Sequence, residues 1–94
     1  MIDLQIANRD NLSDHIYFKN YERIDESQIF DAIIEKLSSV LDISMEQTEV
    51  LPYSLVKKCR WRSGFFEIIL DDDYGASIFS EDSEMLKKIR EIFN

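Results

Sequence analysis

The chain contains few residues of several types, and each scarcity narrows the class of protein. One cysteine, Cys59, cannot form an internal disulfide, so nothing indicates a secreted, cross-linked scaffold. Only two glycines and one proline argue against low-complexity or disordered segments. No apolar run approaches the roughly 20 residues that span a bilayer, and the N-terminus lacks a signal-peptide pattern. These absences predict one reduced, cytoplasmic domain over residues 1–94, without a membrane partner.

Residues that carry catalysis are equally scarce. His15 is the single histidine, and no motif places a serine, cysteine or aspartate beside it. Gly64 and Gly75 each fit a turn, which excludes a glycine-rich phosphate loop. No group of cysteines and histidines has the spacing of a zinc site. The sequence therefore predicts a protein that is not an enzyme and that needs no cofactor or metal ion.

Acidic residues are abundant and unevenly placed. Nineteen acids against eleven bases give a net charge of −8, which opposes binding to nucleic acids and anionic membranes. Residues 1–56 carry 11 acids and 4 bases (−7), residues 57–62 carry four bases (+4), and residues 63–94 carry 8 acids and 3 bases (−5). A basic segment therefore crosses an acidic chain, and no nucleic-acid partner is expected.

Hydrophobic periodicity predicts the first half of the fold. Alternation over residues 2–6 and 15–21 predicts an N-terminal β-hairpin. A helix is expected from an N-cap at Asp25 to about Asp42, and residues 44–53 are expected to form a connector. The apolar stripe of this helix is Ile29, Phe30, Ile33, Ile34, Leu37, Val40 and Leu41.

The second half predicts a three-stranded meander and a terminal helix. Alternation over residues 54–62 puts Cys59 and Trp61 on the buried face, and a Ser63-Gly64 turn leads into residues 65–70. A turn at Asp71 to Gly75 precedes a short strand over residues 76–80, and Ser80 or Asp82 caps the last helix. The helix stripe is Met85, Leu86, Ile89, Ile92 and Phe93, with Lys87, Lys88 and Arg90 in its last turns.

Together these elements predict an α+β fold. We expect an antiparallel sheet of about five strands with two amphipathic helices, in the order β-β-α-β-β-β-α. Each helix is apolar on one side only, so each is expected to lie against a sheet face or against the other helix.

Two charged stretches are open to a functional interpretation. Asp71, Asp72 and Asp73 offer oxygen ligands for Ca²⁺ or Mg²⁺, but the spacing of an EF-hand loop is missing, which favours a solvated turn or an acidic, partner-facing knob. The basic segment, with Trp61 within it and Phe65 and Phe66 beyond, has the composition of an RNA-binding sheet. Pairing of its cations with acids on neighbouring strands is the favoured alternative. Its four cations are Lys57, Lys58, Arg60 and Arg62.

An acidic, compact domain without catalytic groups is suited to covering a basic active site, where its carboxylates take the place of phosphates. In size, acidity and mixed α/β layout, the whole chain resembles the small immunity proteins that bacteria carry beside polymorphic or contact-dependent growth-inhibition toxins. The resemblance implies an antitoxin that binds one cognate, basic, nuclease-type toxin domain. The expected contact residues, placed at one end of the fold, are Asp71, Asp72, Asp73, Tyr74, Glu81, Asp82 and Glu84.

An adaptor or subunit is the competing interpretation. Here the basic segment with Trp61, together with the Tyr17 and Tyr21 face of the N-terminal hairpin, forms a homodimer contact or a docking surface for another protein. This interpretation predicts association of the protein with itself at high concentration.

Overall fold

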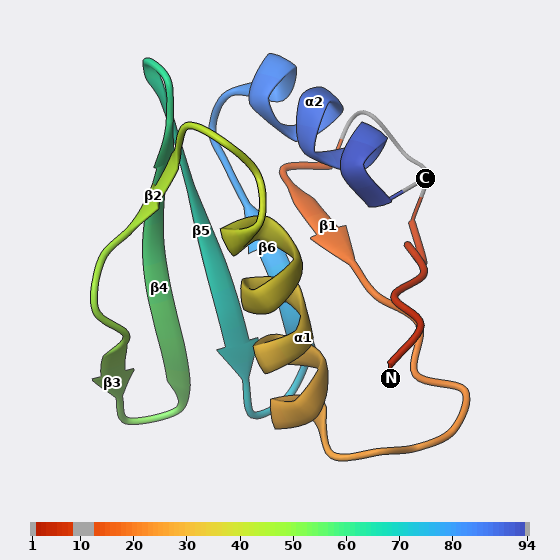
Figure 1. Ribbon diagram of the computed structural model, residues 1–94. Coiled ribbons are helices and arrows are strands. Elements are labelled where there is room, and N and C mark those ends of the chain that lie inside the picture. Colours follow the sequence, from red (N-terminus) through yellow and green to blue (C-terminus); the bar gives the residue numbers. More distant parts are fainter. Residues whose placement is uncertain (1, 9–12, 94) are drawn as a thin grey trace.

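The computed structural model describes residues 2–8 and 13–93, and in these residues the chain forms one antiparallel sheet of six strands and two helices (Figure 1). The predicted α+β class, with an antiparallel sheet and two amphipathic helices, is confirmed. The elements are β1 (His15–Tyr17), α1 (Glu26–Ser38), β2 (Ile43–Met45), β3 (Glu49–Leu51), β4 (Ser54–Trp61), β5 (Gly64–Asp71), β6 (Gly75–Phe79) and α2 (Ser83–Phe93).

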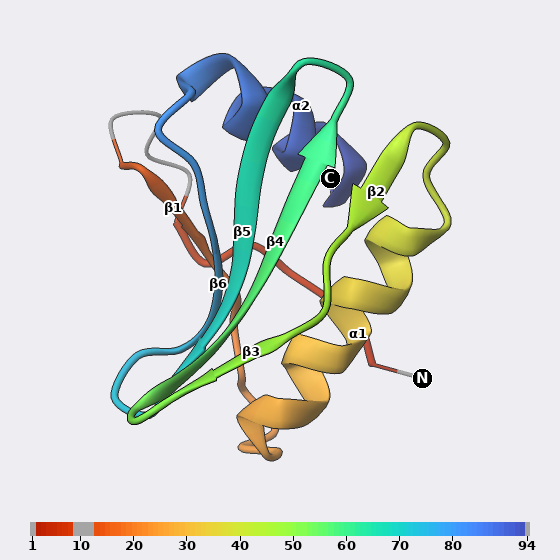
Figure 2. The same ribbon diagram turned by 90° about the vertical axis from the view of Figure 1, so that its left-hand side faces the viewer.

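The strand order is β1-β6-β5-β4-β2, and β3 pairs with the same edge of β4 as β2 does. The two long strands β4 and β5 are joined by a tight hairpin, and β6 continues the meander. Helix α1 lies on one side of this sheet (Figure 2). Buried residues of α2 belong to the same hydrophobic cluster as those of α1, so both helices cover the same face.

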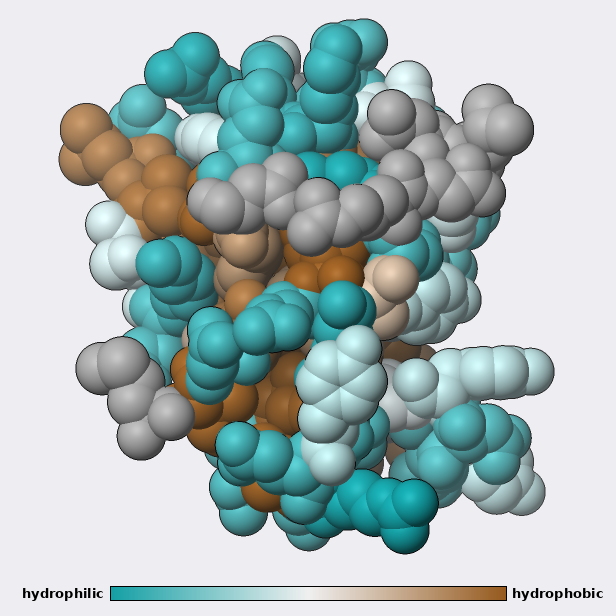
Figure 3. All heavy atoms as spheres, turned by 90° about the vertical axis from the view of Figure 1, so that its right-hand side faces the viewer, coloured by the Kyte–Doolittle hydropathy of each residue, from teal (hydrophilic) through white to brown (hydrophobic). Residues whose placement is uncertain are grey.

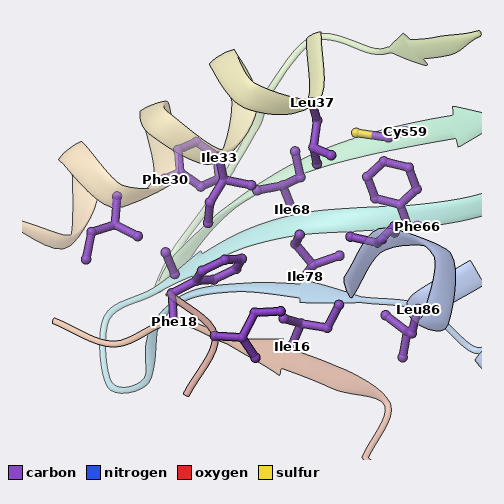
Figure 4. Packing of buried hydrophobic residues seen from close by; sticks show 14 of the residues in the cluster. Ile16, Phe18, Phe30, Ile33, Leu37, Cys59, Phe66, Ile68, Ile78 and Leu86 are labelled. Carbon is purple, nitrogen blue, oxygen red and sulfur yellow. The ribbon is translucent and has the colours of Figure 1, made fainter. Parts of the chain in front are cut away.

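Alternation along the strands explains which face the helices cover. Cys59, Phe66, Ile68 and Ile78 are neighbours in the register across β4, β5 and β6, and all are buried. Lys58 and Arg60, the residues on either side of Cys59, are exposed. The predicted division of β4 into an apolar and a basic face is therefore confirmed. Figure 4 shows the core between sheet and helices; its helical members are Ile29, Phe30, Ile33, Leu37, Met85, Leu86 and Ile89.

Helix α1 begins as predicted and ends earlier than predicted. The Asp25 side chain accepts a hydrogen bond from the Ser27 amide at 2.9 Å, which caps the helix and lowers the pKa of Asp25. The predicted end near Asp42 is wrong, because the helix stops at Ser38. The hydroxyls of Ser38 and Ser39 donate to carbonyls one turn back, a competing bond that favours termination. Leu41 is consequently 84% exposed.

The N-terminal hairpin differs from the prediction. Residues 2–6 form no strand, and the predicted strand over residues 15–21 is reduced to β1. The predicted pairing is present only as a bridge between Ile6 and Phe18, with backbone hydrogen bonds from Ala7 to Tyr17 and from Lys19 to Gln5. The Asn8 side chain donates to the carbonyl of His15 and accepts from the amide of Tyr17, both at 2.7 Å. A side-chain amide thus occupies positions that a neighbouring strand would otherwise fill.

The surface around the N-terminal segment carries both apolar and polar residues. Leu4 and Ile24 pack against the core, and Ile2 and Tyr21 line a shallow pocket beside them. Figure 3 shows apolar residues gathered in the middle of this surface, with polar residues above and below them.

Residues 44–53, which were predicted to form a connector, contain the end of β2 and the whole of β3. Pro52 and Tyr53 form a two-residue turn between β3 and β4, so the proline is compatible with pairing on either side of it.

The turn predicted at Ser63-Gly64 lies one residue earlier: Arg62 has a φ of 58°, and Gly64 is the first residue of β5.

At the start of α2, Asp82 is the cap, because its carboxylate accepts from the amides of Glu84 at 3.0 Å and Met85 at 3.4 Å. The Ser80 hydroxyl instead donates to the carbonyl of Phe65 at 2.8 Å. Arg90, expected in the last turns of the helix, is buried there, and one of its guanidinium nitrogens donates to the Asn8 carbonyl.

The turn after β5 contains the predicted positive φ, 76° at Gly75. The Glu26 carboxylate lies against this glycine, accepting from the amide of Ala76 at 3.3 Å and from the Asn20 side chain at 3.1 Å. A Cβ atom at position 75 would lie 2.7 Å from the carboxyl carbon of Glu26. The start of α1 therefore fits closely against β6 only because residue 75 has no side chain.

We expect Gly75→Ala to lower the free energy of unfolding by about 2 kcal/mol or more, since it adds left-handed strain and this contact. Gly64→Ala is the matched comparison. Its Cβ would meet the Sδ-bound methyl of Met85, a flexible chain end that can move, so the loss should be smaller. Urea unfolding of both variants measures the difference, and an equal or larger loss for Gly64→Ala would contradict this account.

Candidate protein-binding surface

The seven predicted contact residues do not lie together. Asp71 to Tyr74 occupy the turn between β5 and β6, whereas Glu81, Asp82 and Glu84 follow the other end of β6, where α2 begins (Figure 1). The five extended residues of β6 separate the two groups by about 16 Å. The expectation that proximity in sequence places them at one end of the fold is therefore wrong.

The β5–β6 turn uses one of its three aspartates internally. Oδ1 of Asp71 accepts from the amides of Asp73 at 2.8 Å and Tyr74 at 3.1 Å. The side chains of Asp72 and Asp73 are exposed, and Tyr74 is 77% exposed. The turn therefore presents two carboxylates beside an aromatic ring.

The turn between β3 and β4 lies directly beside these aspartates. The amide of Asp72 donates to the carbonyl of Tyr53 at 3.0 Å, and Leu51, Ser54 and Asp71 are aligned across three strands. Tyr53 is 77% exposed and Val50 is 80% exposed. We call this surface the acidic–aromatic end; it comprises Val50, Leu51, Tyr53, Asp72, Asp73 and Tyr74.

Three apolar members of this surface were missed because residues 44–53 were interpreted as a connector. The signal that could have found them is Val50-Leu51 followed directly by Pro52-Tyr53. Two consecutive aliphatic residues, one of them β-branched, before a two-residue turn are consistent with a hairpin, whose turn residues are exposed.

The second acidic group borders a hollow at the opposite end of the sheet. Its lining includes Phe65, Phe79 and Glu67, together with Glu81 and Asp82. Lys58 also lines this hollow, and the carboxylate of Asp82 is engaged in capping α2. The hollow is therefore less uniformly negative than the acidic–aromatic end.

The basic segment is partly paired with acids, as the favoured interpretation expected. Lys58 lies 3.4 Å from Glu49 on β3, and Arg62 lies 4.0 Å from Asp42. Arg60 instead donates to the carbonyl of Arg62 and lies 6.0 Å from the ring centre of Phe65.

Trp61 is separated from Lys58 and Arg60. It packs against the core on the face that the helices cover, while Lys58 and Arg60 lie on the other face. Trp61 therefore does not share a surface with Lys58 and Arg60, but it lines a pocket together with Arg62.

The single histidine, His15, and the single cysteine, Cys59, lie on opposite faces of the sheet. Nδ1 of His15 lies 2.8 Å from Asp14, and its ring stacks on Tyr17 and tilts against Phe79. The Cys59 thiol is buried and donates to its neighbour's carbonyl, that of Lys57, at 3.5 Å. The arrangement therefore provides no direct contact between the thiol and the imidazole.

Over residues 2–8 and 13–93, no group of three or more histidine, cysteine or acidic side chains is placed to hold a metal ion. Neither helix formed by these residues is long and apolar enough to cross a membrane.

Comparison of the chain with family models, curated proteins and solved structures gives no match. A functional proposal for this protein therefore depends on its own surfaces.

Burial raises the pKa of the Cys59 thiol from 9.0 to about 12. We expect folded protein to react slowly with a thiol reagent at neutral pH and urea-unfolded protein to react fast; rapid reaction without denaturant would contradict the structure.

Since the pKa of the Cys59 thiol is raised in the folded protein, the stability gained from burying the neutral thiol is complete below pH 9.0 and is lost as the pH rises toward 12. The stability difference between the wild type and Cys59→Ala should therefore shift against the wild type over that range.

Proposed function

We propose that this protein is a non-catalytic, protein-binding domain whose acidic–aromatic end covers a positively charged surface of a protein partner. The observation that supports the proposal is the position of exposed aromatic rings, Tyr53 and Tyr74, beside the exposed carboxylates of Asp72 and Asp73. Among the described residues, neither of these two aspartates forms an ion pair. Both are therefore available to a cationic partner.

The two kinds of side chain have different roles in binding. Tyrosine is enriched among the residues that dominate interface energy, because it buries a large, rigid, amphipathic surface. Exposed carboxylates contribute mainly to the rate of association, because they attract a basic partner before contact. The net charge of −8 extends that attraction over the whole molecule.

The partner class that fits this surface best is an enzyme that acts on a polyanion, such as a nuclease. The active site of such an enzyme carries cations that hold phosphates, and carboxylates can occupy the same positions. We therefore propose that the protein acts in the bacterial cytoplasm as an immunity protein, neutralising a cognate toxin by covering its basic active-site or target-binding surface.

The direct test is co-expression with the product of the gene immediately upstream. If the proposal is correct, the two proteins co-purify, and the C-terminal domain of the upstream product kills cells only when this protein is absent. Absence of both binding and protection would remove the immunity proposal.

Within such a complex, the double substitution Asp72→Lys/Asp73→Lys should slow association by about tenfold at low salt, with a weaker effect at high salt. Asp31→Lys, at an exposed position of α1, is the matched charge control and should change the rate far less. Stopped-flow or surface-binding kinetics give both rates. Equal effects of the two variants would place the interface elsewhere.

The two tyrosines of the acidic–aromatic end should affect the rate of dissociation from the partner. Tyr53→Ala and Tyr74→Ala should each accelerate dissociation by about tenfold, because hot-spot contacts are lost after the encounter. Tyr21→Ala, at an aromatic residue that is similarly exposed and lies outside the acidic–aromatic end, is the control. Unchanged dissociation rates for both Tyr53→Ala and Tyr74→Ala would contradict the assigned roles.

A further inference from the structure

The turn between β5 and β6 is held by different groups on the two sides of Tyr74. On the N-terminal side, the carboxylate of Asp71 and the carbonyl of Tyr53 accept hydrogen bonds from amides of the turn. On the C-terminal side, the Glu26 carboxylate accepts from the amide of Ala76 at 3.3 Å. Figure 1 shows that the start of α1 lies at the same end of the molecule as this turn. Helix α1 therefore supplies one anchor of the turn, from a residue 50 positions away in the chain.

The Glu26 carboxylate bonds to β6 at the point where strand pairing stops. The register between β1 and β6 ends with Tyr17 opposite Ser77. Ala76 lies one residue beyond this pairing, and its amide donates to Glu26 instead of to β1. Backbone groups at the end of a strand pairing open most easily, because fewer bonds must break to release them. The carboxylate thus closes the section of β6 that leads into the turn.

Glu26 is itself fixed in place. The side-chain amide of Asn20 donates to the Glu26 carboxylate at 3.1 Å and to the carbonyl of Ile24 at 2.8 Å. The amide of Ile24 donates back to the Asn20 side chain at 3.0 Å. On its other side the carboxylate lies against Gly75, which leaves no room for a Cβ atom. A carboxylate held in this way can fix the position of the turn rather than follow its movement.

The direction of the Tyr74 ring depends on the backbone of the turn. The ring is 77% exposed, so packing against other side chains holds little of it in place. The next residue is Gly75, at a φ of 76°, and glycine is the residue whose backbone is least restricted. A binding residue that is already in position loses less conformational entropy when the partner docks. An anchor immediately after Gly75 therefore favours binding through Tyr74.

We infer that Glu26 is a positioning residue for the acidic–aromatic end: it holds the backbone that follows Tyr74 and so keeps the tyrosine oriented for the partner. The inference rests on the proposed function. Both oxygens of the Glu26 carboxylate accept hydrogen bonds within the chain, from Ala76 and from Asn20. Its effect on binding is therefore exerted through the turn and not through contact with the partner.

Amide hydrogen exchange, measured by NMR on the free protein, tests the positioning without a partner. Glu26→Ala should accelerate exchange at Ala76 and Tyr74 about tenfold. Exchange at Ile68, in the core of β5, should stay near that of the wild type. Glu35→Ala is the matched control, because it removes the same side chain from an exposed position of α1, and it should change none of these rates. Unchanged exchange at both turn positions, or an equal acceleration at Ile68, would overturn the inference.

The conservative variant Glu26→Gln separates hydrogen bonding from shape. It keeps the size of the side chain but has one accepting oxygen for the two donors that face it, Ala76 and Asn20. Its effect on exchange should therefore lie between those of the wild type and Glu26→Ala. Exchange as fast as in Glu26→Ala would show that charge, and not the bonded oxygen, is what the turn requires, and would overturn the inference.

Kinetics of the complex test the consequence for binding. Glu26→Ala should accelerate dissociation about threefold, at high salt as well as at low salt, whereas loss of a charge alone would act on association and fade with salt. Glu26→Ala/Tyr74→Ala should dissociate no faster than Tyr74→Ala, because Glu26 acts through that ring. Independent, multiplying effects of these two substitutions would overturn the inference. If the wild type forms no complex, the proposed function fails, and the exchange rates still decide whether Glu26 positions the turn.

Discussion

Hydrophobic packing on one side of β4, β5 and β6 is the constraint on which the rest of the structure depends. Cys59, Phe66, Ile68 and Ile78 alternate with polar or partly exposed neighbours, so a shift of one residue in any pairing would move an apolar set away from the helices. The register that this packing enforces also aligns Leu51, Ser54 and Asp71 at one end of the sheet. The acidic–aromatic end is thus a product of core packing, although none of its members belongs to the core.

Elements with strong periodicity could be predicted from the sequence. So could single residues whose role depends only on their neighbours in the chain. The stripe of α1, the cap at Asp25, the two faces of β4 and the positive φ at Gly75 all depend on neighbours within a few positions. Residues 2–6 alternate like a strand, yet they pair only at a bridge between Ile6 and Phe18, and next to that bridge the Asn8 side chain bonds to β1. A tertiary contact of this kind leaves no periodic signal in the sequence.

The candidate site was predicted in part. The exposed turn at Asp72, Asp73 and Tyr74 was expected, but its companions Val50 and Tyr53 come from a hairpin some 20 residues earlier in the chain and are brought close by strand pairing. Glu81 and Asp82 are near the turn in sequence and distant in space, because an extended strand separates residues faster than any other element. The position of Arg90 in the last turns of α2 was expected, but its burial was not, because the Asn8 carbonyl that it bonds lies 82 residues away in the chain.

The bonding of Asn8 to β1 also affects how the sheet meets other molecules. An edge strand with free amides and carbonyls is a template on which further strands can add, in fibrils as well as in ordered complexes. Here the Asn8 amide group occupies the carbonyl of His15 and the amide of Tyr17. At the far edge, β2 and β3 are two three-residue strands that pair with β4 on either side of residues 46–48. Because one border is bonded to a side chain and the other consists of two short, separated strands, strand addition is disfavoured at both borders, and association is favoured at the faces and turns.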